Sequence, residues 1–211
     1  METPAEKYIR EHSTPQSEAL KWLERQTNIR TNYPIMLSGA VQGRLLTMLV
    51  QLTKAERVLE IGTFTGYSAI CMAYGLPDSG HIDTLELNDE LEDLIVEGFE
   101  RAGVADKIKL HIGDAIQTLQ DMEGCSYDMA FIDANKREYC DYYNYSIDLV
   151  KPGGLIVADD TLWSGKLFEE TVPKDKQTQG IARFNDLVAS DSRVETVVLP
   201  IRNGLTLIRK K

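Results

Sequence analysis

The chain has 211 residues, 43% of them hydrophobic and 27% charged, which is the balance of a globular protein with one substantial core. Its formal net charge of −10 disfavours long-range attraction to a nucleic acid, and its three cysteines, which lack CxxC spacing, indicate neither a disulfide framework nor a structural zinc site. We therefore expect one domain over residues 1–211, located in the cytoplasm, without a signal peptide or a membrane-spanning segment.

Residues 1–35 are expected to form an N-terminal helical segment. Helical patterning runs over residues 3–30 and again over residues 39–52, and the stretch TNYPIML around Pro34 separates the two. Because the first helix carries Trp22 among its apolar residues, we expect it to make dimer or substrate contacts rather than to carry catalysis.

Five stretches of strand length follow, and helical stretches alternate with them. The expected strands are residues 57–62, 81–87, 107–114, 127–133 and 154–160, and the expected helices are residues 68–76, 88–104 and 139–150. This alternation is typical of a parallel sheet covered on both faces. The last two expected strands, RVETVVLP and LTLIRK, are joined by a tight-turn sequence that predicts an antiparallel hairpin. The sequence therefore predicts a Rossmann-like, doubly wound, mostly parallel α/β sheet of seven strands with a C-terminal antiparallel hairpin.

The first expected strand runs into a glycine-rich turn, EIGTFTGYS, at residues 60–68. Ligands of open parallel sheets bind outside the carboxyl ends of the strands, and Gly62 and Gly66 let the backbone approach such a ligand closely. A dinucleotide fingerprint would need glycine at the position of Phe64, and a Walker loop would need a lysine that the turn lacks. The turn therefore favours an adenosine-like ligand that places no phosphate there.

Acidic residues follow the turn at the ends of the expected strands. Glu86 ends the second strand, where a carboxylate can accept hydrogen bonds from both ribose hydroxyls, although a lone glutamate there is more often solvated. Glu60 could face a cationic group of the ligand. Asp114 could meet an adenine edge or cap the next helix, and the two interpretations are compatible.

Three further acids end two other strands, namely Asp133 in FIDANK and the pair Asp159 and Asp160 in GLIVADD. Since neighbouring strands lie about 4.8 Å apart, these acids could meet around one cation, and oxygen ligands suit Mg²⁺, Mn²⁺ or Ca²⁺. Lys136 could act as a general base if the cation and burial lower its pKa, although a lysine at this spacing is usually a surface residue.

These motifs resemble those of the class I S-adenosylmethionine-dependent O-methyltransferases, specifically the divalent-cation-dependent group of catechol and caffeoyl-CoA O-methyltransferases with their small bacterial relatives. VLEIGTFTGYS is similar to the first motif of the family, FIDANKREYCDYY to its metal and base motif, and GGLIVADDTLWSG to its second metal motif. MLSGAVQG resembles the segment that closes over the methionine part of the cofactor. The similarity extends from about Pro34 to the C-terminal hairpin.

The resemblance implies a cofactor, S-adenosyl-L-methionine, and a divalent cation. It implies cofactor contacts from Met36, Ser38, Glu60, Gly62, Phe64, Ser68, Glu86, Asp114, Ala115 and Asp133. It implies metal ligands at Asp133, Asp159 and the next residue, which is asparagine in most of the family but Asp160 here. Lys136 and Asp133 are the implied catalytic residues, and a homodimer is the implied assembly.

The implied function is methyl transfer to a hydroxyl of a catechol-like or other phenolic small molecule, because two adjacent oxygens chelate a metal well. A second interpretation within the family is methylation of 5-hydroxyuridine in transfer RNA, which the net charge of −10 disfavours. A third, of another class, is a non-catalytic cofactor-binding or interaction protein on the same fold. Asp133, Lys136 and Asp159 argue against the third interpretation, whereas Asp160 leaves it open.

The acceptor side is less well marked in the sequence. The polar loop 164–180 is expected to cover the acceptor. An aromatic wall could come from Trp163, Tyr139, Tyr142 and Tyr143, although aromatic residues at this spacing are more often part of a core. Arg183 and Asn185 are also candidates to face the site.

Overall fold

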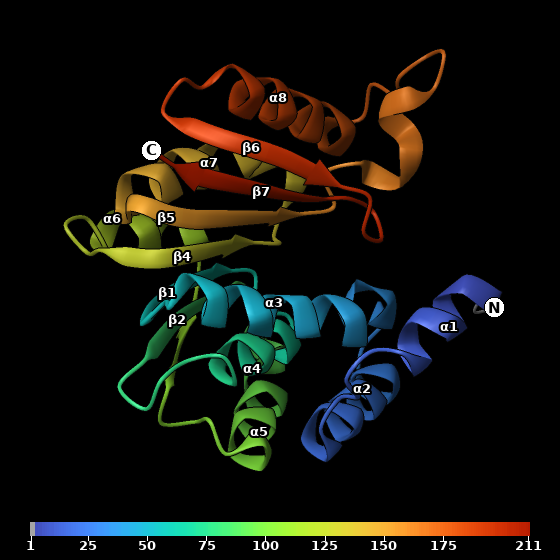
Figure 1. Ribbon diagram of the computed structural model, residues 1–211, viewed down its shortest axis with the longest axis vertical. Helices are drawn as coiled ribbons and strands as arrows, with labels where there is room; N and C mark the ends of the chain where they lie inside the picture. Colours follow the sequence, from blue (N-terminus) through green and yellow to red (C-terminus); the bar gives the residue numbers. More distant parts are fainter. Residues whose placement is uncertain (1–2) are drawn as a thin grey trace.

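The computed structural model describes residues 3–211, so the first two residues of the expected N-terminal segment lie outside the described residues. Over the described part of the chain, seven strands form one sheet in the order β3-β2-β1-β4-β5-β7-β6 (Figure 1). The strands are β1 (Arg57–Ile61), β2 (His81–Glu86), β3 (Ile108–Ile112), β4 (Tyr127–Ile132), β5 (Val150–Asp159), β6 (Val194–Leu199) and β7 (Leu205–Lys210).

Strands β1 to β5 run parallel, whereas β7 is antiparallel to both β5 and β6. Leu59 of β1 is in register with Asp83 of β2 on one side and with Ala130 of β4 on the other. Every residue of β1 after Arg57 is buried, as expected for a strand that is covered on both faces. The predicted sheet, with its C-terminal antiparallel hairpin, is confirmed.

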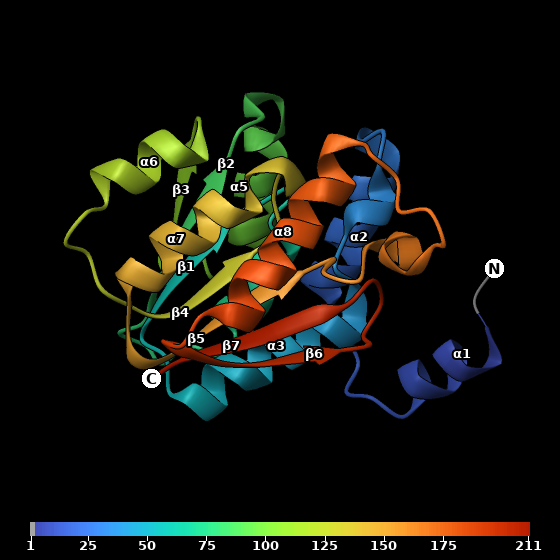
Figure 2. The ribbon, with the colours of Figure 1, turned by 90° about the horizontal axis from the view of Figure 1, so that it is seen from above.

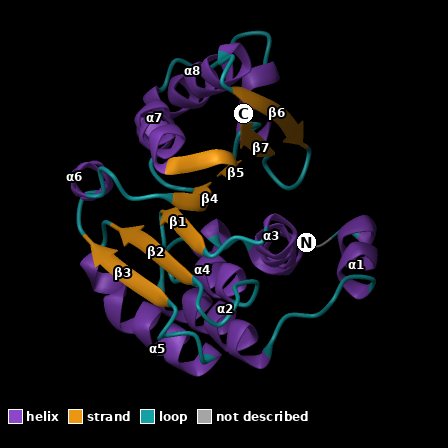
Figure 3. Cartoon of the chain, turned by 60° about the vertical axis from the view of Figure 1, so that its left-hand side comes forward, coloured by secondary structure: helices purple, strands orange, loops and turns teal. Residues whose placement is uncertain are grey.

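Helices cover both faces of the sheet, as predicted (Figure 3). One face carries α2 (Glu18–Arg30), α3 (Gly39–Thr53), α4 (Tyr67–Ala73) and α5 (Glu92–Ala102). The other face carries α6 (Ala115–Asp121), α7 (Tyr139–Leu149) and α8 (Lys176–Ser190). The sheet therefore separates two clusters of buried apolar side chains, one that includes Ile70 and Phe99 and another that includes Tyr143 and Phe184.

The N-terminal helical segment is interrupted, whereas the sequence pattern predicts helix over residues 3–30. α1 (Pro4–Glu11) ends ahead of Pro15, which has no N–H to donate within a helix. Ser17 then caps α2, because its side chain accepts a hydrogen bond from the Leu20 N–H at 3.3 Å. As a result α1 projects away from the rest of the chain (Figure 2).

The expected loop over residues 164–180 is shorter than predicted. Trp163–Phe168 contains 3-10 turns that are interrupted by non-helical backbone at Ser164 and Gly165, and α8 already begins at Lys176. The Asp175 side chain caps α8 by accepting hydrogen bonds from the Gln177 N–H at 3.1 Å and the Thr178 N–H at 3.0 Å. Because the sequence KDKQTQ is polar, it resembles a loop, although it contains the capping Asp175 and the first turn of α8.

The stretch Pro34–Thr53 is long and apolar enough to cross a membrane by length and composition alone. In the structure it consists of the 3-10 turn Pro34–Met36 and of α3, which packs against α4. Core helices of water-soluble proteins can have the same length and composition, so a single stretch of this kind is weak evidence of a membrane-spanning helix.

The β1 and β4 strands are neighbours at the centre of the sheet. The next strand beyond β1 is β2 on one side, and the next strand beyond β4 is β5 on the other. Open parallel sheets bind ligands outside the carboxyl ends of such a strand pair. The two motifs that follow these strands are in direct contact there, because the Asp133 N–H donates to the Ile61 carbonyl at 2.9 Å. The fold thus joins the glycine-rich turn to the acidic motif.

Candidate active site

A cavity of about 750 Å³ opens at this edge of the sheet. The residues around it come from the first turn, from the segments that follow β2, β3, β4 and β5, from residues 35–38, from α8 and from the turn between β6 and β7. The sequence-predicted residues that line it are Met36, Ser38, Gly62, Phe64, Ser68, Glu86, Asp114, Ala115, Asp133, Lys136, Asp159 and Asp160. Among the lining residues that sequence reasoning missed are Ile35, Asn135, Gln177, Arg202 and Asn203.

The glycines of the first turn make room for other parts of the protein, a backbone segment at Gly62 and a side chain at Gly66. Gly62 has φ of 101°, and a Cβ atom added there would lie 2.1 Å from the Asp133 carbonyl oxygen. Gly66 has φ of 89°, and a Cβ atom there would lie 2.6 Å from the ring of Phe99. Both positions therefore require glycine for conformation and for space.

Glu86 holds the turn in place from the end of β2. One carboxylate oxygen accepts a hydrogen bond from the Phe64 N–H at 2.7 Å, and the other accepts from the Asn88 N–H at 2.9 Å. Burial raises the pKa of Glu86, and the backbone N–H groups partly oppose that effect. Glu86 also lines the cavity, and its contact with ribose hydroxyls stays a prediction.

Asp114 fulfils its structural role, because it caps α6 by accepting a hydrogen bond from the Gln117 N–H at 3.0 Å. It also lines the cavity. Its predicted contact with an adenine edge is compatible with the cap, since a carboxylate can accept several hydrogen bonds.

Glu60 lies beneath the turn and does not line the cavity, in contrast to its predicted contact with a cationic group of the ligand. Its side chain is fully buried, and the Thr84 hydroxyl donates a hydrogen bond to it. Burial raises its pKa to about 8, although hydrogen bonds from Ser68 and Thr84 oppose the shift. Because β1 is covered on both faces of the sheet, the Glu60 side chain is buried, which its position near a strand end in the sequence does not reveal.

Glu60 should make the folded state less stable as the pH rises. Below pH 4.5 the carboxyl is protonated in both the folded and unfolded chains. Between pH 4.5 and about 8 the unfolded chain loses this proton while the folded chain keeps it, so stability falls. We expect Glu60→Gln to remove about 3–5 kcal/mol of this decline, measured by urea unfolding between pH 5 and pH 8.5. The variant should still lose some stability as the pH rises, because the raised pKa of Asp159 acts in the same direction. If the unfolding free energies of parent and variant fell equally with pH, the raised pKa would not belong to Glu60.

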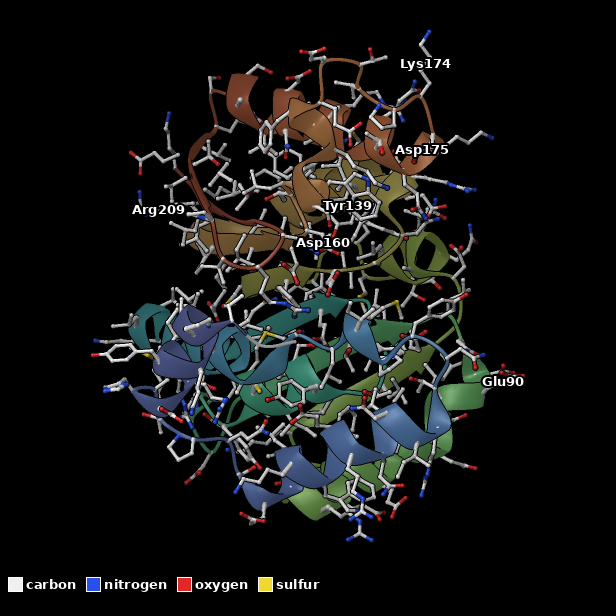
Figure 4. The ribbon with its side chains drawn as sticks, turned by 90° about the vertical axis from the view of Figure 1, so that its right-hand side faces the viewer. Glu90, Tyr139, Asp160, Lys174, Asp175 and Arg209 are labelled. Atoms are coloured by element: carbon white, nitrogen blue, oxygen red, sulfur yellow. The ribbon has the colours of Figure 1, made fainter. Side chains whose placement is uncertain are left out.

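Lys136 is the centre of the acidic cluster beyond β4. Its ammonium nitrogen lies 2.8 Å from Asp133 Oδ1, 3.1 Å from Asp160 Oδ2 and 2.6 Å from the Tyr139 hydroxyl. Figure 4 labels two of these partners, Tyr139 and Asp160. Burial opposes the charge on the lysine, but Asp133, Tyr139 and Asp160 raise its pKa well above the usual value. Burial alone therefore does not lower the pKa of Lys136, which is here an ammonium group held by two carboxylates, and its role as a general base beside a cation stays a prediction.

Asp159 is not paired with Lys136 and has hydrogen-bond partners of its own. Its carboxylate accepts a hydrogen bond from Gln42 Nε2 at 2.6 Å and another from the Asp160 N–H at 2.8 Å. Burial, followed by the negative charges of Asp133 and Asp160, raises its pKa to about 7. Gln42 belongs to the MLSGAVQG segment, and only the fold brings it to Asp159 from α3.

A ready-made metal site of three carboxylates is not found among residues 3–211, in contrast to the predicted ligand set Asp133, Asp159 and Asp160. Lys136 ties two of these side chains, and the third is turned toward Gln42. The donor chemistry nevertheless fits a hard cation, because all three groups are oxygen ligands on one cavity. The lysine ammonium also marks a place between two carboxylates where positive charge is stabilised.

The acceptor side is formed by fewer aromatic residues than predicted. Tyr142 and Trp163 line the cavity, whereas Tyr139 and Tyr143 are fully buried between α7 and α8. Tyr139 supports the site from below, since its hydroxyl donates to the Asp159 carbonyl at 2.9 Å. Asn185 does not line the cavity but donates to the Thr161 carbonyl at 2.8 Å, and Arg183 does not line the cavity either.

Known proteins match both the sequence and the fold. A family model described as O-methyltransferase matches residues 10–211. Caffeoyl-CoA O-methyltransferase 1 of Eucalyptus globulus is 37% identical over 198 residues, which cover 88% of this chain and 79% of that protein. Caffeoyl-CoA O-methyltransferase 1 of Nicotiana tabacum is 37% identical over 199 residues, with coverages of 88% and 82%.

Solved structures match the whole described fold. An O-methyltransferase from Bacillus cereus in complex with SAH has a TM-score of 0.92 at 30% identity, covering 100% of this chain and 98% of that chain. TomG from Streptomyces achromogenes, in complex with SAM, has a TM-score of 0.92 at 29% identity, with coverages of 100% and 97%. These matches favour an enzyme over a non-catalytic binding protein on the same fold.

Proposed function

This chain belongs to the O-methyltransferase family and is an S-adenosylmethionine-dependent O-methyltransferase, and we propose that it methylates a hydroxyl of a catechol-like or other phenolic small molecule with the help of a divalent cation. The observation that carries the proposal is the convergence of Asp133 and Asp160 on one cationic group in the cavity beside the glycine-rich turn. The plant relatives support the acceptor class, because a caffeoyl group has two adjacent phenolic hydroxyls.

In the reaction, a bond forms between the acceptor oxygen and the methyl carbon as the bond from that carbon to sulfur breaks, and the electron pair stays on sulfur. The cofactor supplies the electrophilic methyl group. We propose that the glycine-rich turn, Ser38, Glu86 and Asp114 hold the cofactor, because they line the same cavity as the acidic cluster. Alignment of two bound reactants can contribute about 7–11 kcal/mol in favourable cases, so positioning is the main task of these residues.

We propose Asp133, Asp159 and Asp160 as the residues that would hold the cation, whose chemistry would be to stabilise negative charge on the acceptor oxygen. Lys136 already carries a proton while it is paired with Asp133 and Asp160. As an ammonium group it cannot accept a second proton, so it would have to release its own proton to solvent before it could take the hydroxyl proton. That release would become easier if the carboxylates held a metal cation, because they would then stabilise the ammonium charge less. Tyr142 and Trp163 would flank the acceptor ring.

Chelation of divalent cations should abolish methyl transfer. We expect labelled S-adenosylmethionine to methylate catechol in the presence of Mg²⁺, with activity lost by at least about 10²-fold in EDTA and restored by excess Mg²⁺. Because oxygen ligands also suit Mn²⁺ and Ca²⁺, the same assay ranks the three cations. Equal rates with and without chelator would refute the cation requirement and leave the methyltransferase assignment in place.

The acceptor is tested in the same assay with a panel of phenols and total RNA. Transfer to vicinal diols and not to matched monophenols would support the proposal. Label that enters transfer RNA only would instead favour methylation of 5-hydroxyuridine, which the net charge of −10 disfavours.

A further inference from the structure

The chain that leaves β5 adopts an unusual backbone conformation beside the acidic cluster. Asp160, Trp163 and Ser164 have φ of 60°, 49° and 53°, in the left-handed region that residues other than glycine rarely occupy. Such conformations cost free energy and persist only where the surrounding structure fixes them. The segment 160–164 must therefore be held in place by contacts from elsewhere in the chain.

The turn between β6 and β7 supplies these contacts. The Gly204 carbonyl accepts a hydrogen bond from the Thr161 N–H at 3.1 Å, and the Asn203 carbonyl accepts from Leu162 at 2.7 Å and from Trp163 at 3.2 Å. A Cβ atom on Gly204 would lie 2.5 Å from the Leu162 nitrogen, so the two backbones are as close as they can be. These bonds are made by main-chain atoms and do not depend on the Asn203 side chain.

The Asn203 side chain adds a separate contact to Asp160. Its Nδ2 donates to Asp160 Oδ1 at 3.1 Å, while Oδ2 of the same carboxylate lies 3.1 Å from Lys136 Nζ. The Asn203 Oδ1 atom accepts a hydrogen bond from the Ser164 hydroxyl at 3.2 Å, which orients the amide so that its NH₂ group faces the acid. The two carboxylate oxygens of Asp160 thus have different donors, Asn203 after β6 and Lys136 after β4.

We propose that Asn203 is a positioning residue for Asp160: its amide anchors one carboxylate oxygen and leaves the other directed at the cation position that Lys136 Nζ occupies. The inference rests on the proposed function in one respect, namely that Asp160 binds a divalent cation. An amide suits this role because it donates to an ionised acid, whereas a carboxylate at position 203 would repel it.

The first test is Mn²⁺ binding to the cofactor-free protein, measured by electron paramagnetic resonance of free Mn²⁺. Asn203→Ala should weaken binding about 5- to 20-fold, comparable to the loss of other residues that orient metal ligands. Ser164→Ala is the matched comparison, because it keeps the Asn203 amide and removes only the hydrogen bond that orients it, so it should weaken binding less than Asn203→Ala does. In an Asp160→Ala background, Asn203→Ala should have no further effect.

The second test needs no cation and uses thermal unfolding. Asn203→Asp places two carboxylates face to face and should lower Tm by about 3–6 °C. Adding Asp160→Asn should restore most of that loss, because the amide and the acid then exchange places. The inference is overturned if Asn203→Ala leaves the Mn²⁺ Kd unchanged, if its effect persists in Asp160→Ala, or if the exchange restores nothing. Absence of Mn²⁺ binding to the parent protein would instead refute the proposed cation site, and the cation-directed role of Asn203 with it.

Discussion

Gly62→Ala should destabilise the protein by about 3–5 kcal/mol and abolish cofactor binding. The added methyl group would lie 2.1 Å from the Asp133 carbonyl oxygen, which belongs to the backbone and cannot turn aside as a flexible side chain could. Relief requires β1 and β4 to separate at the carboxyl edge of the sheet, where the turn and the acidic motif meet. The φ of 101° adds strain that an alanine tolerates poorly. Urea unfolding and calorimetric titration with S-adenosylhomocysteine measure the two effects.

Gly124→Ala is the matched control for this prediction. Gly124 also has a positive φ, 85°, but no atom lies within 4 Å of the position where its Cβ would be. Its substitution therefore carries the conformational cost alone, about 1 kcal/mol, and should leave cofactor affinity unchanged. If the two variants were equally destabilised, the close approach of the two backbones would not be what requires glycine at position 62.

Asp133→Asn should lower kcat/KM by about 10²–10³-fold under the proposed function. The substitution keeps the volume of the side chain but removes a charge that lies 2.8 Å from Lys136 and faces the cavity. Loss of this charge should lower the affinity of the proposed site for a cation, so the Mg²⁺ concentration needed for activity should rise about 10- to 100-fold. Initial rates over a Mg²⁺ series at saturating acceptor measure both quantities.

Asp141→Asn provides the control for charge. Asp141 lies in the first turn of α7, eight positions further along the chain, but it is exposed and does not line the cavity. This variant should keep the parent rate and the parent Mg²⁺ dependence. A similar loss in both variants would indicate a general effect of net charge, and an unchanged rate in Asp133→Asn would remove Asp133 from the catalytic site.

Much of the fold could be predicted because its signals are local. Apolar runs such as YDMAFI mark buried parallel strands, and the Asn203-Gly204 dipeptide marks the turn of the hairpin. Predictions failed where a local signal was overridden or concealed. Pro15 and Ser17 divide the expected N-terminal helix, and the polar start of α8 resembles a loop until Asp175 is recognised as its cap.

Most residues of the predicted site line one cavity, but the sequence did not reveal their hydrogen-bond partners. Spacing alone placed Asp133, Lys136 and Asp160 near one another, since each follows the end of one of two adjacent strands. It did not show that Glu60 turns inward or that Tyr139 is buried, because the direction of a side chain depends on strand register and helix packing. The homodimer and the cytoplasmic location stay predictions.

The expected strands, the glycines of the first turn and the acids at the strand ends could be predicted from the sequence, because each is encoded within a few neighbouring residues. The groups that those acids contact depend on the tertiary structure. Gln42 reaches Asp159 across 117 positions and Asn203 reaches Asp160 across 43, distances over which no periodicity operates. Such contacts arise when the sheet assembles, since strand pairing and close packing bring distant backbones to within hydrogen-bonding range. The charge state of Lys136 is set in the same way, by two carboxylates that converge on it only in the folded chain.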